Sequence, residues 1–164
     1  MQKSLPRWLV VAGTFFAAFV LAPLMHVVLP NALSQLAPRL GWRAGRPGVW
    51  NLFGLIPVVA GVGLLLQSGF FHLKAMPGRV EMRPTANYLV QQGPYRFTRN
   101  PTYLAGLAAW LGWAVYYGSL PVLGGAALWA AATNYVFIPR EERALLEVFG
   151  DTYRDYLERT RRWL

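Results

Sequence analysis

Residues 102–138 decide the fold of this chain, and they read TYLAGLAAWLGWAVYYGSLPVLGGAALWAAATNYVFI. The stretch contains two apolar segments, 102–117 and 120–138, which only Gly118 and Ser119 separate. A membrane-spanning helix needs about 20 mostly apolar residues, so both segments lie near the short end of the spanning range. We therefore expect a tight helical hairpin in a membrane, either tilted or incompletely spanning.

Two longer apolar segments precede the hairpin. Residues 8–29 and residues 49–71 contain no acidic residue, lysine or arginine. Lys3 and Arg7 precede the first segment, as basic residues do in a signal peptide. However, the stretch is long for a signal core and no clear small-residue cleavage site follows it. The sequence thus predicts about four membrane helices, the first of them retained.

Composition supports an all-α, polytopic membrane protein. Of 164 residues, 55% are hydrophobic and 14% are charged, against about 25% charged in a typical soluble domain. Mean hydropathy is +0.30. We expect a single membrane domain, with an N-terminal helix and loop in residues 1–48 and the functional core in residues 49–164. The formal charge of +9 would otherwise suggest nucleic-acid binding, but basic loops beside membrane helices give the same sum, so no nucleic-acid partner is expected.

The basic residues also predict the topology. Four crossings place thirteen of the sixteen lysines and arginines on one side, and only Arg39, Arg43 and Arg46 on the other. The positive-inside rule then puts both termini and the long loop in the cytoplasm.

The chain has no cysteine, which excludes disulfides, thiolate metal sites and a cysteine nucleophile, and no metal site is predicted.

Two polar segments remain. Residues 72–101 form the longest loop, rich in proline, glycine and basic side chains. Long loops without structure of their own are often functional. Apolar residues recur at helical spacing through residues 140–162, with charges between them, which predicts an amphipathic helix at the membrane interface, broken near Gly150.

The first candidate site lies where the loop meets the hairpin. Pro101 suits the first turn of a helix, and Asn100 is then the expected N-cap residue. Arg99 precedes this helix N-terminus, whose free N–H groups and dipole favour anions. The alternative is a capped helix start whose arginine binds lipid phosphate.

The second candidate site follows the hairpin. Glu141 and Glu142 are adjacent carboxylates directly after the last membrane segment. One of them could face a cavity and bind a cationic or hydroxylated ligand, with Asn134 seven residues earlier on roughly the same face. The alternative is that both carboxylates only complement a helix dipole. The Gly61-Val62-Gly63 motif by itself indicates helix packing more than a ligand site.

The two sites together carry a family resemblance. The pattern is Leu89-Val90-x-x-Gly93-x-Tyr95-x-x-x-Arg99-Asn100-Pro101-x-Tyr103, a hairpin, then Glu141-Glu142-x-x-Leu145-x-x-x-Phe149-Gly150-x-x-Tyr153-x-x-Tyr156. Over about residues 54–164 it resembles the isoprenylcysteine carboxyl methyltransferases and the related phospholipid N-methyltransferases. The resemblance implies an integral-membrane methyltransferase that uses S-adenosylmethionine in a pocket open to the cytosol, with a lipid-like or hydrophobic acceptor as partner.

The resemblance also assigns residues. It implies cofactor-binding positions at Gly61, Gly63, Leu89, Val90, Tyr95, Asn100, Pro101, Thr102, Tyr103, Glu141 and Glu142. Arg99 is the candidate catalytic residue, acting electrostatically toward the cofactor carboxylate or the pocket backbone. The family often has histidine where this chain has Asn100, and asparagine does not titrate near neutrality, so no proton shuttle is expected there.

Other functions and acceptors stay open at this level. A non-catalytic membrane scaffold or lipid-binding protein would explain the helices and basic loops equally well, but not the combined motifs. A membrane reductase shares a related C-terminal architecture but would have further N-terminal helices. The methyl acceptor could be a carboxylate, a thiol or an amine.

Overall fold

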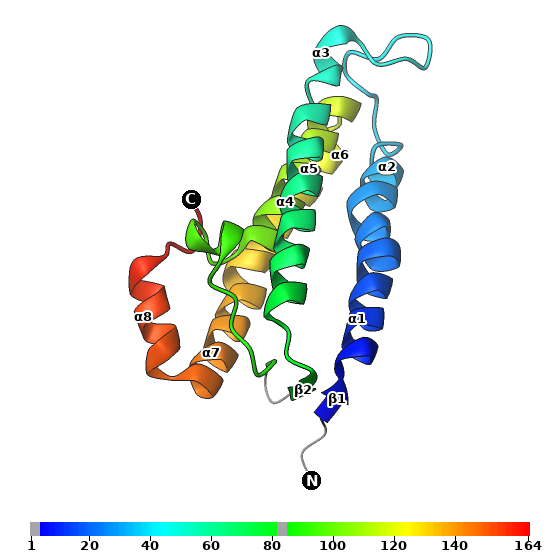
Figure 1. Ribbon diagram of the computed structural model, residues 1–164. Helices are drawn as coiled ribbons and strands as arrows, with labels where there is room; N and C mark the ends of the chain where they lie inside the picture. Colours follow the sequence, from blue (N-terminus) through cyan, green and yellow to red (C-terminus); the bar gives the residue numbers. More distant parts are fainter. Residues whose placement is uncertain (1–3, 82–84) are drawn as a thin grey trace.

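The computed structural model describes residues 4–81 and 85–164 and shows an elongated helical protein (Figure 1). Lys3 and Arg83, two of the basic residues in the topology argument, lie outside the described residues. Within the described residues, three helices are long and apolar enough to cross a membrane: Arg7–Leu33, Val49–Ala75 and Leu120–Phe149. The expected all-α membrane protein is confirmed.

The N-terminal helix runs along the outside of the bundle (Figure 1). Its parts are α1 (Arg7–Phe16), two π-helical turns (Ala17–Leu21 and Leu24–Val28) and α2 (Leu29–Leu33). Pro23 lies between the π-helical turns, where its missing N–H cannot complete the α-helical ladder. A short strand before the helix, β1 (Ser4–Pro6), pairs antiparallel with β2 (Arg79–Glu81) in the long loop, so the fold has one small sheet that the sequence did not predict.

The predicted hairpin is confirmed. Its first arm is α5 (Pro101–Tyr117), and its second arm starts with α6 (Leu120–Ala132). Gly118 adopts φ 56°, a left-handed conformation that glycine tolerates, and the Ser119 hydroxyl accepts a hydrogen bond from the Val122 N–H. With 17 residues, α5 is about 25 Å long, which is short for a spanning helix.

Small residues let the next helix approach α5 closely. This helix consists of α3 (Val49–Leu52) and α4 (Leu55–Ala75). A Cβ added at Gly61 would lie 2.6 Å from the Ala105 carbonyl oxygen, and one added at Gly112 would lie 2.5 Å from the Gly54 carbonyl oxygen. The small residues of α5 therefore serve close helix packing.

The C-terminal segment differs from its prediction in one respect. The second arm of the hairpin continues through a π-helical turn (Thr133–Phe137) directly into α7 (Ile138–Phe149). The first half of the predicted interfacial helix is therefore an extension of the membrane helix. The predicted break at Gly150 is confirmed, because its φ of 51° turns the chain into α8 (Asp151–Arg159), which folds back beside α7 (Figure 1).

The connection between α2 and α3 packs against the end of the bundle that contains the hairpin turn. Asn51 is fully buried, and its side-chain amide donates to the carbonyl oxygens of Leu40 and Val115. Its Oδ1 accepts from the Gly48 N–H. Trp42 donates its indole N–H to the Tyr116 carbonyl oxygen at 2.9 Å. These contacts fix the connection to the end of α5.

Candidate functional site

The first turn of α5 meets α7 through a hydrogen bond between Tyr103 and Glu141. The Tyr103 hydroxyl donates to Oε2 of Glu141 at 3.1 Å. Glu141 remains exposed, and within residues 4–81 and 85–164 its other oxygen, Oε1, has no hydrogen-bond donor. The residue therefore offers an accessible carboxylate oxygen beside a phenol.

Tyr95 joins this cluster from the loop. It lies in the 3₁₀ turn Gly93–Arg96, and its hydroxyl is 2.8 Å from Nε2 of His72 at the end of α4. Burial first, and then the negative charge of Glu141, raise the pKa of Tyr95. The side chain of Thr102 faces the same phenol. The loop, α4, α5 and α7 thus contribute polar groups to one place, with Tyr95 in its neutral form.

Leu89 and Val90 line a cavity between the end of the long loop and the end of α4. Val90 is buried and Leu89 is half-buried. The cavity has a volume of about 300 Å³ and is lined by Phe71, Lys74, Ala75, Leu89, Val90, Gln91 and Gln92. The end of the long loop therefore borders a cavity, where sequence analysis expected a cofactor-contacting segment.

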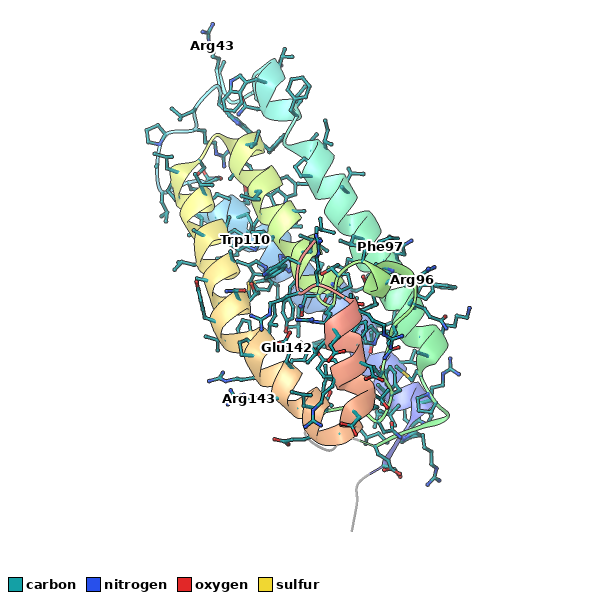
Figure 2. All side chains as sticks on the ribbon, turned by 90° about the vertical axis from the view of Figure 1, so that its left-hand side faces the viewer. Arg43, Arg96, Phe97, Trp110, Glu142 and Arg143 are labelled. Atoms are coloured by element: carbon teal, nitrogen blue, oxygen red, sulfur yellow. The ribbon has the colours of Figure 1, made fainter. Side chains whose placement is uncertain are left out.

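Glu142 faces a different set of partners from its neighbour Glu141. Its Oε1 accepts from Nη2 of Arg99 at 3.0 Å, and its Oε2 accepts from Nη2 of Arg162 at 2.6 Å. Figure 2 shows Glu142 among α7, α8 and the C-terminal segment, whereas Arg143 points away from the bundle. Glu142 therefore joins the C-terminal segment to α5, and its carboxylate is occupied.

Arg99 is held by the same segment. Its Nη1 donates to the carbonyl oxygens of Leu157 and Thr160, at 2.9 and 2.6 Å. Together with the ion pair to Glu142, these bonds engage both terminal nitrogens of the guanidinium. Its Nε is buried and has no hydrogen-bond partner among the residues that the structure describes. The catalytic role of Arg99 stays a prediction, and the geometry gives this side chain a positioning role.

The predicted N-cap position of Asn100 is confirmed, but its side chain makes no capping hydrogen bond to α5. Its Nδ2 instead donates to the Arg162 carbonyl oxygen at 3.0 Å, which also accepts from the Thr98 hydroxyl. A tertiary contact with the C-terminal segment has replaced the local cap. Pro101 is in the first turn of α5, as expected.

The glycine pair stands apart from the cluster. Gly61 is buried against the backbone of α5 at Ala105, and Gly63 has open space beside it. Residues two apart on a helix point in nearly opposite directions, so the Ala105 face of α5 is not the Tyr103 face. Cofactor binding by these glycines stays a prediction, and Gly61 has a packing role.

Sequence analysis assigned no site role to His72, or to Tyr156, which stands in the family pattern. The hydroxyl of the buried Tyr156 donates to the Tyr95 carbonyl oxygen at 2.6 Å and so holds the loop against α8. Tyr153 is also buried and lies among the charges of Arg99 and Glu142. The spacing of the two tyrosines on an amphipathic helix was a usable signal, whereas His72 had none, because its partner is 23 residues away.

A second, larger groove lies between the hairpin and the end of the chain. Its volume is about 690 Å³, and it is lined by Leu104, Leu107, Ala130, Ala131, Asn134, Tyr135, Trp163 and Leu164. The Trp163 indole N–H donates to Oδ1 of Asn134 at 3.2 Å. Asn134 and Glu141 do not share a partner, because the π-helical turn Thr133–Phe137 changes the helical phase between them. Both nevertheless face the start of α5, at Leu104 and Tyr103 respectively.

Comparisons with known proteins identify related sequences. The sequence model of the phospholipid methyltransferase family matches residues 54–152, which contain most of the cluster. The chain is 42% identical over 69 residues to methanethiol S-methyltransferase 1 of Bradyrhizobium diazoefficiens, covering 40% of this chain but only 22% of that protein. It is 37% identical over 62 residues to an uncharacterized protein of Haemophilus influenzae, covering 38% of this chain and 98% of that protein. No solved structure matches the chain significantly.

Proposed function

Because the chain belongs to the phospholipid methyltransferase family, we propose that it is a membrane methyltransferase that transfers methyl groups from S-adenosylmethionine to a hydrophobic acceptor at the cytosolic membrane face. One observation carries the proposal. Tyr95, Tyr103 and Glu141, which lie up to 46 positions apart in the sequence, meet at the start of α5.

The residues present fit this cofactor. S-adenosylmethionine carries hydroxyl and ammonium groups that donate hydrogen bonds, a carboxylate, and a flat base. Glu141 offers a free carboxylate oxygen for the donors, and Lys74 lines the cavity as a cation for the carboxylate. Leu89, Val90 and Phe71 give the same cavity apolar surface for the base. The chain therefore supplies a complementary group for each part of the cofactor.

Methyl transfer requires little from the protein other than orientation of the two reactants. When bound, the cofactor supplies a methyl group on a positively charged sulfur: the acceptor's lone pair forms the new bond to carbon, and the carbon–sulfur pair stays on sulfur. Holding reactants in line can lower such a barrier by about 7–11 kcal/mol. Arg99 and Glu142 serve this purpose by fixing the start of α5 against α7 and the C-terminal segment.

The acceptor class follows from the surroundings of the site. One relative is named for the methylation of methanethiol, a small thiol, and the family is named for phospholipids. Both are apolar or have apolar parts, and the 690 Å³ groove beside Tyr103 offers an apolar surface. We propose that the acceptor lies in this groove and the cofactor on the side of the loop.

Calorimetry of the purified protein in lipid nanodiscs tests the proposal. We expect S-adenosylmethionine to bind, and Glu141→Gln and Tyr103→Phe each to weaken binding about tenfold, because each removes a hydrogen bond involving a charged group. Glu147→Gln, an exposed change on the same helix, is the matched control. Equal affinity in parent, Glu141→Gln and Tyr103→Phe would show that these assignments are wrong. No binding by the parent, or binding of a reduced nicotinamide instead, would refute the function.

A further inference from the structure

We propose that Asn134 selects the acceptor by donating a hydrogen bond to an uncharged oxygen of an apolar, single-chain molecule in the 690 Å³ groove. The inference rests on the proposed function and names the acceptor's chemistry. Polar side chains inside a membrane are costly unless they have a partner, so such residues are functional candidates. Asn134 is half-buried in the membrane helix, in a π-helical turn, a feature frequent at functional sites.

The contact with Trp163 fixes which way the Asn134 amide points. An indole N–H can only donate, so the oxygen of the amide must face Trp163. The two N–H groups of Nδ2 therefore point elsewhere, and within residues 4–81 and 85–164 no acceptor binds them. Because Asn134 lines the groove, these donors are available to a molecule inside it.

The lining of the groove restricts the charge of its occupant. The side chains of the eight lining residues are apolar or neutral, so none of them supplies a cation. A phosphate or carboxylate in this place would lose its hydration without gaining a cation, which costs several kcal/mol. A ketone, ester or ether oxygen needs only one donor, which Nδ2 provides. The groove thus suits an uncharged oxygen on an apolar chain.

The position of Asn134 along its helix gives its depth in the membrane. Asn134 follows the hairpin turn at Ser119 by 15 residues and Glu141 follows it by 22, which places them about 22 and 33 Å from the turn. In a hydrocarbon core about 30 Å thick, Asn134 lies inside the core and Glu141 at its edge. Tyr135 and Leu164 at the groove are largely exposed, so the groove opens toward the bilayer. Along the helix axis, Asn134 therefore lies about 10 Å deeper in the membrane than Glu141.

A binding experiment without cofactor tests this inference. Because the chain has no cysteine, Leu164→Cys places a single solvent-sensitive dye at the rim of the groove, in otherwise intact protein in nanodiscs. The probes are 2-dodecanone, dodecane and dodecanoate. We expect the ketone to bind about tenfold more tightly than the alkane, and dodecanoate more weakly than the ketone. The Asn134→Leu variant should bind ketone and alkane equally.

Two further variants separate recognition from folding. Gln67→Leu removes an exposed amide from α4 and should leave the ketone preference unchanged. Trp163→Phe removes the indole donor that orients the Asn134 amide, and should weaken the ketone preference because the amide can then rotate. Equal binding of ketone and alkane by the parent, tighter binding of dodecanoate, or an unchanged preference in Asn134→Leu would each overturn the inference. Loss of S-adenosylmethionine binding in calorimetry would refute the proposed function alone, since the groove is probed without cofactor.

Discussion

Different contacts join α5 to its neighbouring segments at the two ends of the bundle. At the turn end, the fully buried Asn51 makes three hydrogen bonds and joins the α2–α3 connection to α5. At the other end, Glu142 joins α5 to the C-terminal segment with two ion pairs. The second end also brings polar groups from the loop, α4, α5 and α7 together around the exposed Glu141. The comparison teaches that polar contacts fix both ends, whereas polar groups from several elements meet at an accessible carboxylate only at the proposed site.

The adjacent glutamates show the same contrast on a smaller scale. Glu142 is enclosed, with both oxygens bound by arginines, and Glu141 is exposed, with one oxygen free. Successive residues on a helix point about 100° apart, so neighbours in sequence can face different surroundings. Glu141 is therefore suited to ligand binding, and Glu142 to holding the structure in place.

The sharpest test asks whether the two ends lie on opposite sides of the membrane, and its result is all or none. Gln92 and Glu158 are exposed at the site end, and Arg43 is exposed at the turn end (Figure 2). Cysteines placed singly at these positions should react with an impermeant maleimide from one side for the first two and from the opposite side for Arg43→Cys. The positive-inside rule places the first two in the cytoplasm. Labelling of all three from the same side would contradict the topology.

The Glu142→Leu variant should cause the largest loss of stability. The side chains of Arg99 and Glu142 are only 12% and 15% exposed, so removal of the carboxylate leaves a nearly buried guanidinium without its partner. The expected cost is about 3 kcal/mol in the free energy of unfolding. Unfolding in mixed detergent micelles measures it, and Glu147→Leu, an exposed glutamate on α7, is the control. Equal stability of the two variants would show that Glu142 does not stabilise the fold.

Disruption of the turn end should reduce stability but not ligand binding. In Asn51→Leu, two carbonyl oxygens and one N–H lose their buried partner, at a cost of about 2 kcal/mol. Calorimetry should still give the parent affinity for S-adenosylmethionine, because the site is at the other end. A loss of affinity in the folded variant would mean that the two ends are coupled.

The smallest effect concerns alkaline pH. Burial first, and then the charge of Glu142, raise the pKa of Tyr153 to about 12, above its value in the unfolded chain. Below about pH 10 both states keep the proton and stability is unaffected. Above it the unfolded state loses the proton first, so stability falls by up to about 1.4 kcal/mol per pH unit. Tyr153→Phe should show a shallower decline in melting temperature between pH 9.5 and 11, and an identical decline would contradict the pKa shift.

Most of the fold could be predicted from the sequence, because a bilayer reduces the problem to length and hydrophobicity. The apolar segments, the hairpin turn at Gly118 and the break at Gly150 all follow from local composition and from the conformational freedom of glycine. The continuation of α6 into α7 did not follow. The helix ladder persists through a change from apolar to charged residues, since hydrogen bonding along the backbone does not depend on hydrophobicity.

The sequence by itself determined that polar residues around Tyr103 and Glu141 belong to a family motif. Only the tertiary structure decided which of these residues are free to bind a ligand and which hold the structure in place. Asn100 illustrates this, because its local pattern predicts a cap and the folded chain uses it to bind the Arg162 carbonyl oxygen. His72 shows the same effect, since nothing near it in sequence points to Tyr95. Hydrogen bonds between distant segments depend on where helices end in space, and residue spacing along one helix carries no information about that.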